Sequence, residues 1–241
     1  MRSSLLLLLL FGLGWSVSFA EVAAPAAVDL FNGRDFSGWV KRGGEANYAV
    51  ENGEIVGTTV ANTSNTFLCT EKTYGDFVLE YEFKVDPRLN SGVQIRSLCY
   101  DQPTQFEWEG KTYDIRAGRV HGYQVEIDPD VERKRMWTAG IYEEGRRGWL
   151  YPRGAKSEEA KAFTERGLRI FKQGDWNHVR VEAIGDSIKT WLNGTLCADL
   201  KDAATARGFI ALQVHSVGKD ESKVGTQVRW RNLKITELTP R

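Results

Sequence analysis

Three segments of the chain share an arrangement of residue types that could carry out acid–base chemistry. Each has a glutamine, then one apolar residue, then an ionisable residue; the pairs are Gln94 and Arg96, Gln124 and Glu126, and Gln213 and His215. Arginine, glutamate and histidine are the types that bind anions and exchange protons in catalysis. One such strand is typical of a solvated surface, but three in one chain favour a shared site.

The residues around these pairs alternate as β-strand residues do. In the second segment the apolar set and the polar set occupy opposite faces: Tyr123, Val125 and Ile127 against Gln124, Glu126 and Asp128. The same alternation occurs in Gly92–Arg96 and Phe209–His215. If the three strands lie in one sheet, their six polar side chains converge on one concave surface, which is the predicted site.

Composition limits the kind of protein this is. The chain has 241 residues, with 32 basic and 32 acidic residues and a formal net charge of zero. The length fits one all-β domain, and without a basic patch no nucleic-acid partner is expected. The three cysteines, Cys69, Cys99 and Cys197, lack metal-knuckle spacing and are expected mainly as buried small hydrophobic residues.

The N-terminus has the features of an export signal. Arg2 precedes the apolar run Leu5–Leu13, and Ser18–Ala20 forms a small-x-small cleavage site before Glu21. We expect residues 1–20 to be a signal peptide, 21–28 a linker and 29–241 a single domain. The mature protein would then be periplasmic or secreted, with no membrane contact after cleavage. An uncleaved anchor is the alternative.

Turn signals about every 8 to 12 residues separate short strands and predict an antiparallel β-sandwich. The clearest strand is Phe77–Val85, and Asn52-Gly53 predicts a tight hairpin. Leu98–Val120 is expected to be a long irregular loop with a functional role. Ser157–Glu165 is the one expected helix, with a serine N-cap.

Common catalytic motifs are missing from the sequence. It has no GxGxxG after a strand, no GxxxxGK[ST], no HExxH, no GxSxG and no CxxC. Nucleotide-binding, zinc-protease and serine-hydrolase functions therefore lose their usual support.

Nine segments occur together in one order along Val28–Leu238. They are DLFNGRDFSGW (29–39), GEIVG (53–57), NSGVQIR (90–96), GYQVEI (122–127), TAGIY (138–142), GDWN (174–177), LNG (192–194), IALQVH (210–215) and VRWRNLKI (228–235). Together they resemble the 3-keto-disaccharide hydrolase domain family, formerly a domain of unknown function. The resemblance implies a concanavalin A-like jelly-roll sandwich of the lectin/glucanase type. It also implies cleavage of glycosides that are oxidised to a ketone at C3 of the sugar.

The resemblance further implies which residues form the site. By position they are Arg96, Gln124, Glu126, Tyr142, Gln213 and His215. Many family members have glutamate then glutamine where this chain has Gln124 then Glu126. Because the two positions share a strand face, the site keeps a carboxylate, but in a different place.

A ketone at C3 acidifies the C2 proton, so a base can remove it and the C1 substituent can leave from the enolate. Water then adds back. His215 or Glu126 is the expected base, Arg96 the enolate stabiliser, and Tyr142 an acid or hydrogen-bond donor. Alternatively, Glu126, Asp128 and His215 hold a divalent metal that stabilises the enolate.

The expected partner is a carbohydrate, and the expected substrate-binding residues are Gln94, Gln124, Gln213, Trp149 and Asp128. A non-catalytic carbohydrate-binding module of the same fold is the alternative function. Such a module would use the glutamines and an aromatic rim without needing arginine, glutamate and histidine together. A structural exported domain is a third hypothesis.

Overall fold

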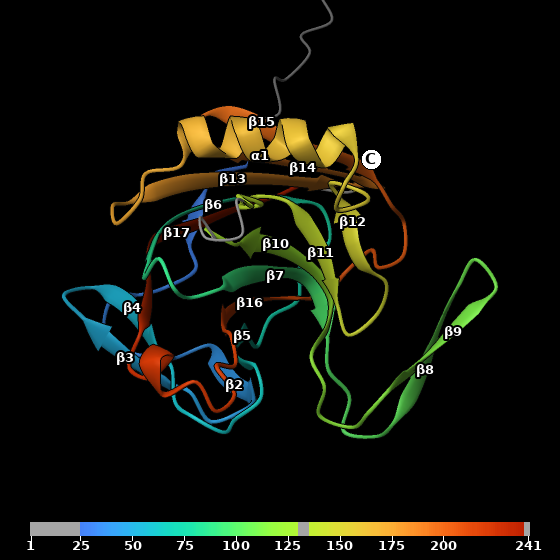
Figure 1. Ribbon diagram of the computed structural model, residues 1–241. Coiled ribbons are helices and arrows are strands. Elements are labelled where there is room, and N and C mark those ends of the chain that lie inside the picture. Colours follow the sequence, from blue (N-terminus) through green and yellow to red (C-terminus); the bar gives the residue numbers. More distant parts are fainter. Residues whose placement is uncertain (1–24, 130–134, 239–241) are drawn as a thin grey trace, which may run out of the picture.

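Alternating apolar residues hold together two large antiparallel sheets, which pack face to face in the computed structural model (Figure 1). The structure describes residues 25–129 and 135–238. The predicted signal peptide and residues 21–24 of the linker lie outside the described residues. The predicted antiparallel jelly-roll sandwich with one α-helix is confirmed.

The first sheet has eight strands. Its strands, in spatial order, are β15 (Thr195–Lys201), β14 (Ser187–Leu192), β13 (Asn177–Ile184), β6 (Phe77–Val85), β17 (Gln227–Glu237), β4 (Glu54–Thr58) and β3 (Asn47–Glu51), and β1 (Val28–Asp29) pairs with β17. Val28, at the end of the expected linker, thus belongs to a strand. The predicted Asn52-Gly53 turn joins β3 to β4, with positive φ at both residues.

The second sheet has seven strands. In spatial order they are β12 (Gly148–Tyr151), β11 (Ile141–Glu144), β10 (His121–Ile127), β7 (Ser91–Leu98), β16 (Phe209–Val214), β5 (Thr66–Thr70) and β2 (Trp39–Gly43). The three strands that carry the glutamine pairs, β10, β7 and β16, are therefore neighbours, as the sequence predicts. None of them follows another directly in the chain.

The core lies between the inner faces of the two sheets. In β6 every second residue from Phe77 to Val85 is buried, and Val93, Ile95, Val125 and Leu212 belong to the same core cluster. In β7, β10 and β16 the alternate, polar residues are also buried. Since an ordinary outer face is hydrated, burial of this second face indicates a covered polar surface.

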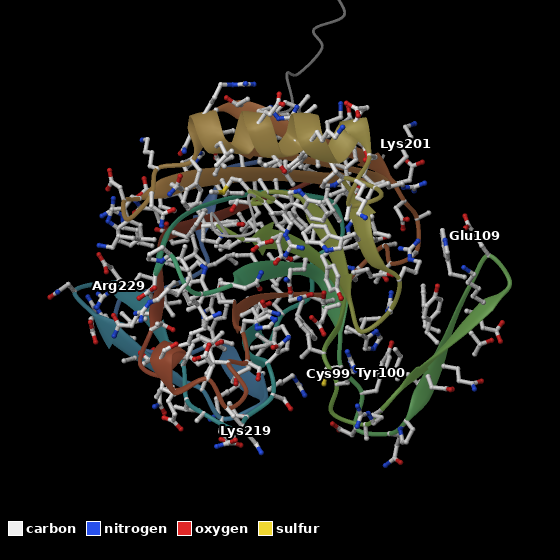
Figure 2. All side chains as sticks on the ribbon, in the orientation of Figure 1. Cys99, Tyr100, Glu109, Lys201, Lys219 and Arg229 are labelled. Atoms are coloured by element: carbon white, nitrogen blue, oxygen red, sulfur yellow. The ribbon has the colours of Figure 1, made fainter. Side chains whose placement is uncertain are left out.

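The expected loop Leu98–Val120 contains a hairpin that the sequence prediction missed. Its strands are β8 (Thr104–Trp108) and β9 (Lys111–Ile115), and Glu109 and Gly110 turn the chain with φ values of 48° and 74°. The hairpin extends away from the sandwich (Figure 1). Figure 2 shows Tyr100 near its base and Glu109 near its tip.

The α-helix of the described residues, α1 (Glu158–Ile170), is N-capped by Ser157 as predicted, since the Ser157 Oγ accepts from the amide of Ala160 at 3.0 Å. It continues past the predicted end at Glu165. Gly167 in its last turn lets the helix pack closely on Met136, because a Cβ there would lie 2.6 Å from the Met136 carbonyl oxygen. A 3-10 helix, η1 (Glu221–Lys223), precedes the last strand.

Two further observations concern the cysteines and the helices. The three cysteine thiols are free, with Cys69 and Cys197 buried. Within residues 25–129 and 135–238, no helix has the length and apolar character needed to cross a membrane.

Candidate functional site

We use the name polar face for the surface of the seven-stranded sheet that carries Gln94, Gln124, Glu126 and Gln213 and points away from the core. Strand register brings these residues together. Gln94 lies opposite Gln124 on β10 and opposite Ala211 on β16, and in the next row Gly92 lies between Glu126 and Gln213. The structure thus confirms that these four residues share one face.

A chain of hydrogen bonds crosses the polar face and ends at Glu126. Ser97 Oγ donates to Gln94 Oε1 at 2.8 Å, and the Gln94 amide nitrogen donates to Gln124 Oε1. Gln124 Nε2 then donates to Glu126 Oε2 at 2.8 Å, while Asn90 Nδ2 donates to Oε1 at 2.6 Å. Every donor points toward the carboxyl group, so the chain fixes its orientation.

The Glu126 carboxyl titrates near neutral pH. Burial raises its pKa from 4.5 to about 8, and the charge of Asp128 acts in the same direction. The hydrogen bonds from Asn90 and Gln124 and the charge of Arg135 oppose this rise. A carboxyl group with such a pKa can donate or accept a proton under physiological conditions, as general acid–base catalysis requires.

Gly92 makes room for the Gln124 side chain. A Cβ at Gly92 would lie 2.6 Å from both Cγ and Cδ of Gln124, closer than atoms can approach. We expect Gly92→Ala to displace Gln124 and to lower turnover about 10-fold or more, because Glu126 loses one of its two donors. Gly75→Ala is a control, since its φ is not positive and the nearest atoms to a Cβ there belong to the end of the Arg207 side chain, at 3.4 Å or more. Equal turnover of the two variants would contradict this role.

A cleft of about 770 Å³ borders one end of the polar face. Asn90, Asp128, Arg135 and His215 contribute to its lining. His215 Nδ1 lies 2.7 Å from the carbonyl oxygen of Ser216, and a carbonyl can only accept a hydrogen bond. The neutral imidazole therefore carries its proton on Nδ1, which leaves Nε2 as the basic nitrogen.

One wall beside this cleft is aromatic and carries an ion pair between Arg135 and Asp128. Arg135 binds Asp128 Oδ2 through Nε at 2.7 Å and Nη2 at 2.6 Å. Its guanidinium also lies 4.8 Å from the Trp137 ring centroid and 5.7 Å from that of Trp149. Trp149 in turn packs edge-on against Tyr142 at 5.4 Å. Asp128, Trp149 and Tyr142, all predicted from the sequence, thus lie in one connected group.

Tyr142 connects the polar face to a second carboxylate. Burial raises the pKa of Tyr142, and the charges of Glu144 and Glu126 raise it further. Glu144 shares the strand face of Tyr142 on β11; it binds Arg119 at 3.3 Å and accepts from Asn65 at 3.5 Å. Glu144, Arg119 and Asn65 line a cavity of about 490 Å³. Two carboxylates, Glu126 and Glu144, therefore influence the same phenol.

Gln213 is buried on the polar face without a hydrogen-bonding partner. Neither its amide oxygen nor its amide nitrogen is paired within the described part of the chain. An unpaired buried amide costs about 1–3 kcal/mol, so its presence favours a ligand that supplies both a donor and an acceptor. The hydroxyl groups of a sugar meet this requirement.

The sequence prediction for Arg96 is wrong, because its side chain does not join the polar face. Arg96 has a φ of +45°, and the register with both neighbouring strands shifts around it, which marks a β-bulge. The buried guanidinium binds Asp76 at 2.9 Å and the carbonyl groups of Gly75 and Gly185 at 2.8 Å. These partners flank strands of the eight-stranded sheet, so Arg96 ties the two sheets together.

The candidate metal ligands do not form a ready coordination site. Residues 25–129 and 135–238 contain no group of three or more His, Cys, Asp or Glu side chains that could hold a metal ion, and this includes Glu126, Asp128 and His215. A divalent metal stays a prediction from the sequence.

Several site residues were missed by the sequence prediction. Asn90 lies in the turn before β7, and Arg135 follows the segment 130–134, so strand alternation could not predict either of them. Glu144 was predictable, because it lies two residues after Tyr142 in the strand IYEE. Residues two apart in a strand point to the same face.

The chain is similar to known proteins in sequence and in structure. The model of the 3-keto-alpha-glucoside-1,2-lyase-like domain matches residues 26–236. No curated protein matches the chain. A proposed glycosyl hydrolase from Parabacteroides distasonis ATCC 8503 is similar in structure, with a TM-score of 0.51, 18% identity and coverage of 88% of this chain and 94% of that one.

Two other solved structures share the fold. A Bacillus subtilis protein of unknown function with a galectin-like fold has a TM-score of 0.58 at 10% identity, covering 91% of this chain and 98% of its own. A glycosidic hydrolase has a TM-score of 0.53 at 12% identity, covering 92% of this chain and 100% of its own. At these identities the likeness shows the fold alone.

Proposed function

Because the chain belongs to the 3-keto-alpha-glucoside-1,2-lyase-like domain family, we propose that it is an exported enzyme that cleaves glycosides carrying a ketone at C3. One observation supports this most directly: a buried carboxyl group, Glu126, has a pKa raised to about 8 and is held by a directed chain of amides. A site that only binds sugar has no need of such a group. Solved structures of the same fold include proteins named as glycosyl hydrolases.

The proposed reaction begins with proton removal. His215 Nε2 takes the C2 proton of the keto sugar, and the electron pair forms the enolate. The C1–O bond then breaks, and Glu126, protonated at neutral pH, gives its proton to the departing oxygen. In the second stage the Glu126 carboxylate takes a proton from water as the water hydroxyl adds to C1 of the enone, and His215 returns its proton to C2. Atoms and charge balance without a redox partner.

The enolate oxygen needs a positive or donor group close to it. Arg96 was expected in this role, but its guanidinium is fully engaged between the sheets. We assign the role to Arg135, which lines the same cleft as His215. Tyr142, next to Trp149 on the polar face, is the second donor in this proposal.

The proposal is tested with purified protein and 3-keto-glucosides, alongside their unoxidised parents, with and without chelator. Release of aglycone or sugar from the keto forms only is the expected result. Binding of either sugar without turnover would instead favour a non-catalytic carbohydrate-binding module, a function that the unpaired amide of Gln213 also suits. Loss of turnover with chelator would support the metal predicted from the sequence.

Trp149 is proposed as a platform for the sugar. Its ring is half-buried beside Tyr142 and Arg135, where an aromatic face can pack on a sugar ring. We expect Trp149→Ala to raise KM about 10-fold while kcat changes less than about 3-fold. Steady-state kinetics measure both constants. Trp191→Ala, on β14 of the other sheet, is the matched control and should change neither.

Export is proposed from the N-terminal sequence. The mature protein should begin near Glu21, which mass spectrometry of the exported protein would measure. Recovery of an intact chain that still begins at Met1 from the cytosol would contradict export.

A further inference from the structure

A separate cavity of about 230 Å³ lies at the base of the β8–β9 hairpin. Its lining includes Tyr100, Thr104, Phe106, His121, Arg146 and Thr205, none of which borders the cleft beside Glu126. His121 and Glu126 lie near opposite ends of β10, about 17 Å apart at the rise of a β-strand. The cavity is therefore distinct from the proposed catalytic site; one of its lining residues, Tyr100, is labelled in Figure 2.

His121 lines this cavity and has an unpaired hydrogen-bond donor. Arg146 Nε donates to His121 Nδ1 at 2.9 Å, so Nδ1 carries a lone pair and the proton of the neutral imidazole is on Nε2. Burial, with Arg146 and Arg119 nearby, lowers the pKa of His121 to about 4, which keeps the ring neutral. His121 is 1% exposed, and Nε2 finds no acceptor among residues 25–129 and 135–238.

The charges around the cavity are already balanced. Arg146 binds Glu143 at 3.3 Å, and Arg147 binds Asp202 at 2.8 Å and also contacts Glu143. Two guanidinium groups thus face two carboxylates. Since no uncompensated charge is left and the imidazole is neutral, the site favours a neutral ligand over an anion.

The remaining groups suit a hydroxyl-bearing ring. The Thr205 hydroxyl accepts from Arg146 at 2.8 Å, which leaves its own hydrogen free to donate. The Tyr100 ring lies 5.6 Å from the His121 ring and is 45% exposed, so it offers an aromatic surface at the entrance. Donors beside an aromatic surface in a small cavity are the features that bind the polar edge and apolar face of a sugar.

We propose that this cavity binds one neutral sugar ring, which accepts a hydrogen bond from His121 Nε2 and packs against Tyr100. The choice of a sugar rests on the proposed function, whereas the cavity and its unpaired donor do not. The bound ring is a different unit from the one that is cleaved. The site would hold a second part of a longer carbohydrate or a second molecule.

The chain offers a direct test because it has only three histidines. In protein labelled with 15N-histidine, His121 reports this cavity, His215 reports the proposed catalytic cleft, and His178 on the outer face of β13 is an internal reference. The probe is unoxidised maltotriose. We expect the His121 Nε2 resonance to shift as maltotriose is added while His178 stays unchanged.

Tyr100→Ala tests the same site without altering the buried network. We expect it to raise the dissociation constant of maltotriose, measured at His121, about 10-fold. Turnover of a 3-keto-glucoside should stay within about 2-fold of wild type. Trp191→Ala, an aromatic change on β14 of the eight-stranded sheet and away from the cavity lining, should leave both values unchanged.

The two proposals fail in different ways. If His121 does not shift with maltotriose, or if Tyr100→Ala and wild type give the same dissociation constant, the sugar site at the hairpin base is wrong. If His121 shifts but 3-keto-glucosides are not cleaved, the sugar site stands and the proposed catalytic function is wrong.

Discussion

Glu126→Gln is expected to lower turnover of a 3-keto-glucoside by at least ~10²-fold. The substitution keeps the size of the side chain and an oxygen that accepts from Asn90 or Gln124, but it removes the proton that we assign to the leaving group. Measurement of kcat and kcat/KM tests this. Glu80→Gln, a half-exposed glutamate on β6, is the matched control and should stay within about 2-fold of wild type. Near-wild-type turnover by Glu126→Gln would remove Glu126 from the mechanism.

The pH dependence provides a sharper test of the same residue. Because Glu126 acts in its protonated form and its pKa is raised to about 8, wild-type kcat should fall as the pH rises above this value. Residual activity of Glu126→Gln should lack this alkaline limb. If kcat of the variant still fell above the same pH as in wild type, the titration would belong to another group.

Stability should follow the same titration with a defined sign. The pKa of Glu126 is 4.5 as an ordinary glutamate and about 8 in the folded protein, so the folded state binds the proton more tightly. This stabilisation is complete below about pH 4.5 and is lost as the pH rises through about 8. The free energy of unfolding of wild type, relative to Glu126→Gln, should therefore fall over this range by on the order of a few kcal/mol. Urea denaturation at a series of pH values measures it.

Arg96→Lys is expected to lower the free energy of unfolding by about 3 kcal/mol. A lysine ammonium cannot reproduce the planar set of bonds to Asp76 and to the carbonyl groups of Gly75 and Gly185. Since this network lies between the sheets, the folded variant should keep kcat within about 2-fold of wild type. Urea denaturation and steady-state kinetics separate the two effects.

The control for Arg96 is Arg180→Lys on β13, where the arginine is 36% exposed and pairs with Glu182 at 2.7 Å. A surface pair of this kind contributes little, so the change should cost less than about 1 kcal/mol. If Arg96→Lys were as stable as wild type and lost turnover, the result would contradict the structural role of Arg96. It would support the catalytic role implied by the family resemblance.

Strand alternation was sufficient to predict much of the fold and part of the site. Val93 and Val125 must face the core, so Gln94 and Gln124 must point to the opposite face, and the structure agrees. The alternation rule fails where the backbone departs from a regular strand. At Arg96 a bulge with positive φ changes the direction of the side chain, and no local residue type announces it.

Other parts of the site depend on contacts that the sequence does not encode locally. Asn90 reaches Glu126 from a turn, and Arg135 reaches Asp128 from an irregular segment, so neither has a periodic signal. The unpaired donor of His121 could not be predicted either, since it depends on Arg146, which lies on the turn between β11 and β12. The β8–β9 hairpin, in contrast, was predictable from the alternation on either side of Glu109-Gly110.

The position of β16 within its sheet has a consequence for how the protein folds. β16 lies between β7 and β5, although most of the domain's sequence separates it from both. Until this late segment is in place, β7 and β5 each leave an edge unpaired, and such edges invite association with other chains. Closing contacts over such long stretches of chain is slow. The proposed enzymatic activity should therefore return only in the last phase of refolding, later than the fluorescence change of tryptophans buried elsewhere.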